Sequence, residues 1–162
     1  MPSVTLIPVA YVRSPRRDLT DDAWGTVKAV IELAEGFEDD SLRGLEQFSH
    51  AEIVFVFDRV EEASVVRGAR HPRDNPAWPR VGIFAQRGKN RPNRLGTTMV
   101  EIVKREGRTL EVLGLDAADG TMVVDIKPVF KEFLPRTQVR QPSWASEVMT
   151  DYWRDVRGET FR

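Results

Sequence analysis

Residues 97–115 read TTMVEIVKREGRTLEVLGL, and this stretch decides the fold class. Its two halves, residues 97–104 and 109–115, are rich in β-branched and apolar residues, and Glu106-Gly107 lies between them as a turn. Apolar and polar side chains alternate with the period of a strand rather than the period of a helix. We therefore expect two antiparallel strands joined by a tight hairpin.

Five further segments of the same kind lie on either side of this hairpin. They are residues 4–12, 26–33, 51–57, 81–85 and 122–126. Turn residues separate them, and the sequence ADGT at 118–121 predicts a second hairpin turn. Many short strands without helices between them favour a mainly β domain, either a barrel or a sandwich, over alternating βα units.

Few helices are expected. Asp39-Asp40-Ser41 supplies an N-cap for a short helix towards Phe48, and Ser143 supplies one for a C-terminal helix that runs through Arg154. Residues 67–79 contain three prolines and are predicted to form a long loop. Loops of this length in small domains are commonly functional or disordered.

Composition bounds the possible chemistry. The 162 residues fit one domain, 1–162, and the start of the chain at Met1 lacks the basic and apolar pattern of a signal peptide. No apolar run approaches the roughly 20 residues that span a bilayer, so a cytoplasmic protein is expected. The absence of cysteine excludes disulfides, thiolate nucleophiles and cysteine-bound zinc. With only two histidines, His50 and His71, a multi-histidine metal site is excluded, and no metal is predicted.

Basic residues are concentrated in one segment of a chain whose net charge is −1. Between Arg67 and Arg94 there are eight basic residues and a single acidic one, Asp74. Such a segment creates a local positive field that attracts phosphate groups. The alternative is a solvated arginine-rich loop without a ligand.

Three segments carry polar groups that can do chemistry. The first is FAQRGKNRPNRLG at 84–96, a loop of guanidinium and amide groups between two glycines. Arginine suits carboxylate or phosphate, and asparagine can bind the edge of an adenine. The spacing of a phosphate-binding P-loop is absent, and the alternative is an ordinary polar loop.

The second segment is LDAADGT at 115–121, followed by DIKP at 125–128. Its two aspartates, three positions apart in a turn, can face one ligand, or they can cap their own backbone amides. The third segment is Phe48-Ser49-His50, where a lone histidine can be structural rather than catalytic. Together the three segments favour an anionic or nucleotide-like ligand but leave the reaction open.

These segments occur in the order of a known pattern. It comprises VRSP at 12–15, GLEQFSH at 44–50, RPNRLG at 91–96 preceded by FAQR at 84–87, and LDAADGT with DIKP at 115–128. The chain thereby resembles the TsaA-like (TrmO) family over roughly residues 4–130. The resemblance implies a small antiparallel β-barrel with a few short helices and a C-terminal helix, with residues 131–162 as a C-terminal extension.

The resemblance also implies a function. Members of the family dimerise, bind S-adenosylmethionine without a Rossmann sheet, and methylate the exocyclic nitrogen of a modified adenosine in tRNA. The cofactor site implied for this chain comprises His50, Ala51, Arg87, Leu95, Leu115, Asp116, Asp119, Gly120 and Thr121.

Roles follow from the chemistry of the implied ligands. Asp116 or Asp119 can hold the ammonium or ribose hydroxyls of the cofactor, and Arg87 can hold its carboxylate. The candidates for orienting the methyl acceptor, and hence for catalysis, are Arg91, Asn93 and Lys127. No metal is required, because methyl transfer depends chiefly on alignment.

The chain departs from the family pattern in several places, including Arg94, which adds a charge where the family has proline. Residues 16–25 read RRDLTDDAWG where the family carries Pro-Arg-Gln-Pro, so Trp24 and Gly25 are candidate substitutes. The C-terminal residues QPSW at 141–144 and YW at 152–153 look like a separate packing device. Two alternative functions remain: a small-molecule methyltransferase with a pocket walled by Trp24, Trp78 and Trp144, and a non-catalytic module that binds S-adenosylmethionine or RNA.

Overall fold

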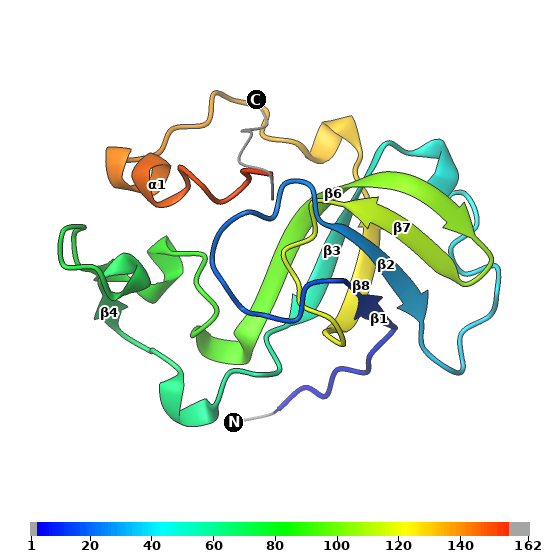
Figure 1. Cartoon of the computed structure of the whole chain (residues 1–162), viewed down its shortest axis with the longest axis horizontal. Helices are drawn as coiled ribbons and strands as arrows, with labels where there is room; N and C mark the ends of the chain where they lie inside the picture. The colour runs from blue at the N-terminus through cyan, green and yellow to red at the C-terminus, as the bar shows by residue number, and fades with distance from the viewer. Residues whose placement is uncertain (1–2, 156–162) are drawn as a thin grey trace.

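The computed structural model describes residues 3–155, and within them six strands close into an antiparallel barrel of order β1-β2-β7-β6-β3-β8. Figure 1 shows this barrel, with the segment that contains β4 at its left side and the connection between β2 and β3 at its right side. The strands are β1 (Ala10–Arg13), β2 (Lys28–Leu33), β3 (His50–Val56), β6 (Leu95–Glu106), β7 (Thr109–Leu113) and β8 (Met122–Pro128). The mainly β fold and the barrel are thus confirmed.

The barrel closes around side chains that alternate along each strand. On β3, Ala51, Ile53 and Phe55 point inward and are at most 1% exposed, while the residues between them are partly exposed. β3 pairs with β6 on one side and with β8 on the other. The period of two therefore places one face of each strand in a single core.

The expected hairpin at residues 97–115 joins β6 to β7, and Gly107 occupies the left-handed region at φ 52°. The turn at 118–121 is not a hairpin, because β7 and β8 are not neighbours in the barrel. The chain instead crosses the end of the barrel between them, and Gly120 turns it at φ 84°. The sequence predicted the turn correctly, but not its partners.

Of the predicted strands, β2 and β7 are each two residues shorter than expected, and two others are shortened much more. Residues 4–9 precede β1 without joining it, and Val4 is 84% exposed because no neighbouring strand covers it. Of residues 81–85 only β5 (Val81–Gly82) is a strand, and it pairs with β4 (Ala69–Arg70) in a separate two-stranded sheet. The long loop predicted at 67–79 is therefore anchored at its start and just beyond its end.

Helical structure is sparse, as expected. The predicted helix after Ser41 is a series of turns that ends in the 3₁₀ helix η1 (Leu45–Gln47). The other 3₁₀ turns are η2 (Glu62–Ser64), η3 (Pro72–Asp74), η4 (Ile83–Ala85), η5 (Pro92–Arg94) and η6 (Lys131–Phe133). The C-terminal helix α1 (Ser143–Val148) begins one residue earlier than predicted, with Pro142 rather than Ser143 as its N-cap, and ends before Arg154.

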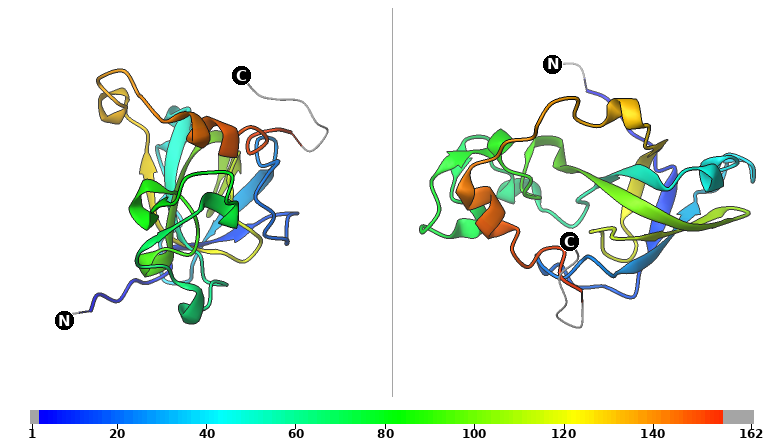
Figure 2. Two further views of the ribbon diagram at one scale, coloured as in Figure 1. Left: turned by 90° about the vertical axis from the view of Figure 1, so that its left-hand side faces the viewer. Right: turned by 90° about the horizontal axis from the view of Figure 1, so that it is seen from above.

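The C-terminal segment does not join the barrel wall. After η6 the chain runs over the molecule, and α1 lies beside the segment that contains β4 and η3 in both views (Figures 1 and 2). Within the described range no helix is long and apolar enough to cross a membrane. The predictions for Met1 and for residues 156–162 of the C-terminal extension fall outside the described residues.

Candidate functional site

A cavity of about 690 Å³ lies against β3 and β6. Six parts of the chain line it: the two strands with the loop at 57–60 after β3, the loop at 85–89 before β6, the loop at 19–24, residues 72–73, the turn at 116–121, and the C-terminal segment 141–153. The lining combines aromatic rings with charged groups of both signs, namely Trp24, Phe57, Trp144, Tyr152, Trp153, Asp21, Asp116, Arg59, Arg73, Arg87 and Lys89. This mixture suits a ligand with both a flat ring and charged groups.

Asp116 lines this cavity with both carboxylate oxygens engaged. The chain turns at Gly114 (φ 81°) and buries Leu115 completely, which brings Asp116 to the end of the barrel. One oxygen accepts a hydrogen bond from the Thr98 hydroxyl, and the other accepts one from the Tyr152 hydroxyl. Burial, with the nearby negative charge of Asp116, raises the pKa of Tyr152, so its hydroxyl remains a proton donor.

Arg16 organises the loop at 14–26. Its guanidinium lies 3.7 Å from the centre of the Trp24 ring and donates hydrogen bonds to the carbonyls of Asp22 (2.7 Å) and Ala23 (2.9 Å). Trp24 is 4% exposed and lines the cavity, whereas Gly25 is not part of the lining. The segment that departs from the family pattern therefore still forms a wall of the site, with one face of Trp24 covered by Arg16.

Carboxylates neutralise part of the basic segment. Arg73 lines the cavity and forms a two-pronged ion pair with Asp22 at 2.7 and 3.0 Å. Arg70 pairs with Asp74 at 2.6 Å, and Arg67 pairs with Glu62 at 3.2 Å. The positive field expected for residues 67–94 is therefore weaker around these three arginines than the sequence suggests.

Two other arginines of the segment keep more of their charge available. Arg87 donates to the carbonyl of Thr97 at 2.5 Å, and Arg91 donates to the carbonyl of Gln86 at 2.9 Å. A carbonyl positions a guanidinium without cancelling its charge. Of the two, Arg87 lies in the cavity wall and is well placed for an anionic group.

The C-terminal segment is held over the cavity by contacts with two different loops. The amides of Ala23 and Trp24 donate to the carbonyls of Asp151 (3.0 Å) and Tyr152 (2.9 Å). The Trp78 indole donates to Glu147 of α1 at 2.9 Å. The aromatic residues of this segment, expected to form a separate packing device, pack on the site itself.

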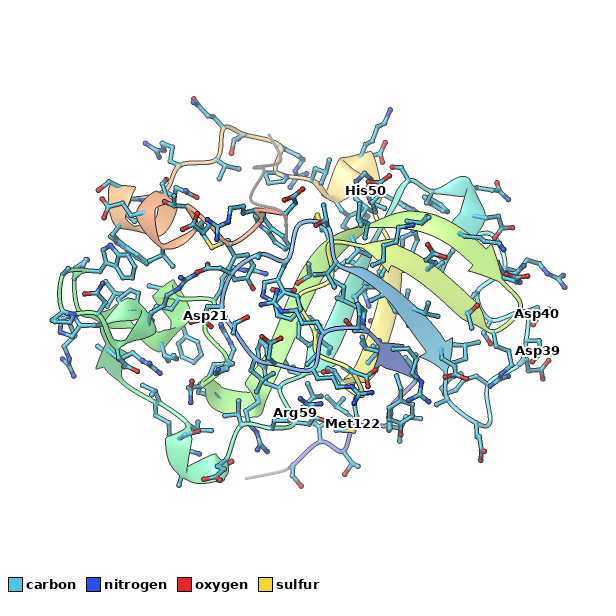
Figure 3. The ribbon with its side chains drawn as sticks, in the orientation of Figure 1. Asp21, Asp39, Asp40, His50, Arg59 and Met122 are labelled. Carbon is cyan, nitrogen blue, oxygen red and sulfur yellow. The ribbon has the colours of Figure 1, made fainter. Side chains whose placement is uncertain are left out.

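The structure brings three of the predicted cofactor residues into the cavity wall: Arg87, Asp116 and Thr121. His50 and Lys127 lie elsewhere, on the outer face of the barrel. In the strand register His50 lies opposite Glu101, and Lys127 lies opposite Glu52. Lys127 also forms an ion pair with Asp125. In Figure 3, His50 is well separated from Asp21 of the cavity.

The outer face nevertheless continues into the cavity wall. Glu52 of β3 lies opposite both Lys127 of β8 and Met99 of β6, and directly opposed residues share a face of a sheet. Met99 is 50% exposed and lines the cavity. Lys127 is therefore two strands away from the cavity wall on the same face.

The remaining predicted residues lie outside the lining. The side chains of Ala51 and Leu115 are completely buried in the core, so they can offer a ligand only their backbone. Asp119 accepts from the amide of Ser14 at 3.0 Å, which leaves it bracing the turn at Gly120. The other three, Leu95, Arg91 and Asn93, lie at the start of β6 and in the loop before it.

Several residues that line the cavity could not be identified from a sequence motif. Asp21, Phe57 and Arg59 belong to no motif, and they reach the cavity because the loops that hold them fold back over the strands. In the C-terminal segment, a cluster of aromatic residues was the sequence signal for a part of the site: Trp144, Tyr152 and Trp153. Among residues 3–155 there is no group of three or more potential metal ligands.

The chain is similar to proteins of known name. The family model of the tRNA-methyltransferase O N-terminal domain matches residues 14–133. A human "tRNA (adenine(37)-N6)-methyltransferase" is 39% identical over 104 residues, which cover 64% of this chain and 23% of that protein. A Pyrococcus abyssi "Probable S-adenosyl-L-methionine-binding protein" is 32% identical over 143 residues, covering 82% of this chain and 72% of that protein.

Solved structures give the same result. The crystal structure of TrmO from Pseudomonas aeruginosa superposes with a TM-score of 0.69 at 26% identity, over 86% of this chain and 62% of that one. The chain thus spans about a quarter of the human relative and about three-fifths of the bacterial one. The match with the family model ends at residue 133, so α1 and the tyrosine that contacts Asp116 lie beyond it.

Proposed function

Because this chain belongs to the tRNA-methyltransferase O N-terminal domain family, we propose that it is an S-adenosylmethionine-dependent methyltransferase acting on an adenine exocyclic nitrogen in tRNA. The observation that carries the proposal is the composition of the cavity. Carboxylate, guanidinium and aromatic groups converge there from parts of the chain that are far apart in sequence.

The residues present fit the cofactor. Asp116 can accept from an ammonium or from ribose hydroxyls with the lone pairs that Thr98 and Tyr152 leave free. Arg87 can donate to a carboxylate, and the rings of Trp144 and Tyr152 offer faces for an adenine or a sulfonium cation. The relatives named as S-adenosylmethionine-binding proteins support the same cofactor.

S-adenosylmethionine supplies an activated methyl group that moves in a single in-line displacement. The task of the protein is therefore to align donor and acceptor and to exclude water. The barrel wall and the C-terminal segment both line the site and can serve this purpose. Arg91, Asn93 and Lys127 remain our proposals for orienting the acceptor, although none of them lines the cavity and Lys127 lies two strands away from its wall.

The tRNA substrate is supported by the names of the relatives and by the cations near the cavity. Arg59, Arg87 and Lys89 line the cavity and can contact phosphates. With a tRNA substrate, we also propose that the enzyme is cytoplasmic. The proposal predicts that activity on tRNA falls steeply as salt increases, because each phosphate contact releases a counterion.

The test combines binding and turnover. We expect calorimetry with S-adenosylmethionine to show one site per chain, and we expect tritium from labelled cofactor to appear in total tRNA. Arg87→Ala should weaken cofactor binding by about tenfold, because it removes a charge-assisted contact. Absence of binding by the wild type at millimolar cofactor would show that the chain shares the family fold without its activity.

We also propose that the protein is a homodimer. The described part of the chain exposes several large apolar side chains, including Phe133 (84% exposed), Phe84 (76%) and Val139 (67%). Water contact with such groups is unfavourable, and a second subunit can cover them. Light scattering coupled to gel filtration should give twice the chain mass, and a monomer at micromolar concentration would contradict the proposal.

A small-molecule acceptor is the second candidate. Two of the three tryptophans expected to wall a closed pocket, Trp24 and Trp144, do line the cavity, whereas Trp78 binds α1 instead. Transfer of label to a metabolite extract, with none to tRNA, would favour this acceptor over the first.

A further inference from the structure

The Tyr152 hydroxyl donates a hydrogen bond to the Asp116 carboxylate in the cavity. Tyr152 itself lies outside the residues that match the family model. The family match covers residues 14–133, whereas Tyr152 follows α1 in the C-terminal segment. Its backbone carbonyl accepts from the Trp24 amide at 2.9 Å, and its ring packs edge-on against Trp153 at 4.9 Å between centroids. The backbone and the ring of Tyr152 are therefore each held by a contact of their own, besides the hydrogen bond from its hydroxyl to Asp116.

Two side chains from different parts of the chain donate hydrogen bonds to Asp116. Thr98 lies on β6 and is 7% exposed, so the barrel itself holds this side of the carboxylate. Tyr152 holds the other oxygen, and it can do so only while the C-terminal segment is docked. Hydrogen bonds to both oxygens set the rotation of the carboxylate plane and direct its remaining lone pairs into the cavity.

We propose that Tyr152 is a positioning residue of the cofactor site, which orients Asp116 towards the ligand. The C-terminal segment is then a component of the site rather than a cover for the barrel. This inference rests on the proposed function, because it assumes that the ligand of Asp116 is S-adenosylmethionine. Removal of the hydroxyl leaves the ring and its packing in place but frees Asp116 to rotate.

The chain offers a matched control, since it contains two tyrosines, Tyr11 and Tyr152. Tyr11 lies on β1, away from the cavity lining. We would measure the dissociation constant and stoichiometry of S-adenosylmethionine by calorimetry for the wild type and for Tyr11→Phe, Tyr152→Phe, Asp116→Asn and the double variant of the last two. The stoichiometry distinguishes weaker binding from misfolding, because a misfolded fraction lowers the stoichiometry and leaves the dissociation constant unchanged.

The expected result is coupling between the two residues. Tyr152→Phe should weaken binding by about tenfold at full stoichiometry, whereas Tyr11→Phe should leave it unchanged. In the Asp116→Asn background the loss of the Tyr152 hydroxyl should change affinity by less than about twofold, because its partner is altered already. Equal losses in both backgrounds, or no loss in Tyr152→Phe, would overturn the inference.

These outcomes are distinct from failure of the proposed function, in which the wild type itself does not bind.

A second measurement does not depend on the ligand. In Tyr11→Phe the only phenol is Tyr152, so its ionisation can be followed by ultraviolet absorbance. Burial and Asp116 raise the pKa of Tyr152, and Asp116→Asn should lower the pH at which its ionisation begins in this background. An unchanged onset of ionisation would show that the hydroxyl does not contact Asp116.

Discussion

The barrel and the C-terminal segment are stabilised in different ways. In the barrel every strand is paired on both sides, and side chains such as Ile53, Val112 and Leu110 are completely buried. The segment from Ser143 to Asp155 has one short helix and is attached to loops by a few hydrogen bonds. Global stability should therefore depend on the barrel, and closure of the cavity should depend on the segment.

The loop at 14–26 connects these two regions. Arg16 holds the loop together from within, and Asp22 binds Arg73 of the basic segment. The same loop offers the amides of Ala23 and Trp24 to the C-terminal segment. A departure from the family pattern at residues 16–25 is thus accompanied by a docking surface for a segment beyond the family match.

The largest effect should come from a cavity in the barrel core. Ile53→Ala removes a side chain that is 0% exposed on β3, and the expected loss in free energy of unfolding is about 2–5 kcal/mol. Urea denaturation measures it. Val103→Ala on β6, where the side chain is 44% exposed, is the control and should stay within about 0.5 kcal/mol. A loss below about 1 kcal/mol for Ile53→Ala would contradict the assignment of stability to the barrel.

A smaller effect is expected where the barrel meets the cavity. A Cβ at Gly96 would lie 2.6 Å from the Phe55 ring and 2.9 Å from the Phe57 ring, and both rings line the cavity. Gly96→Ala should therefore cost about 1–3 kcal/mol and weaken cofactor binding as well. Gly82→Ala is the matched control, because a Cβ there meets nothing within 4 Å. Equal stability of the two variants would show that the rings move aside freely.

The barrel was largely predictable from the sequence, because strand formation follows a local pattern. The hairpin of β6 and β7 is encoded by alternating residues and by Gly107, all within a few positions of one another. The extent of β1 was not predictable in this way. Residues 4–8 have the composition of a strand, but a strand also needs a neighbour to pair with, and backbone pairing begins only at Val9, whose amide donates to the carbonyl of Val123 on β8.

The site was predictable only where a motif marks it. Asp116 and Arg87 stand in motifs and reach the cavity, whereas Asp119 stands in the same motif and points to the amide of Ser14. The direction of a side chain in a turn depends on the backbone angle of its neighbours, which the motif does not display. The contact between Tyr152 and Asp116 joins residues 36 positions apart and depends on the path of the whole C-terminal segment.

Alkaline pH should lower the free energy of unfolding through Tyr152 of the C-terminal segment. The folded state keeps the Tyr152 proton above pH 10, whereas the unfolded chain releases it near its ordinary pKa of about 10. Unfolding then releases a proton, so stability falls by up to about 1.4 kcal/mol per pH unit above pH 10. Tyr152→Phe should lack this component. Parallel stability curves for wild type and variant between pH 9 and 11 would show that Tyr152 titrates normally.

The smallest effect should come from the outer attachment of the C-terminal segment. Trp78→Phe removes the indole hydrogen bond to Glu147, which lies at the surface, so the free energy of unfolding should fall by less than about 1 kcal/mol. The local effect should be larger than the global one, because the Trp24 amide is protected by the carbonyl of Tyr152. Hydrogen exchange at this amide should accelerate by about threefold to tenfold, while amides of β3 should not change. Glu147→Ala removes the same bond from the other side and should match Trp78→Phe in both measurements. If exchange accelerates equally at β3, the segment and the barrel unfold as one unit, and the separation between the region that stabilises and the region that closes the site is lost.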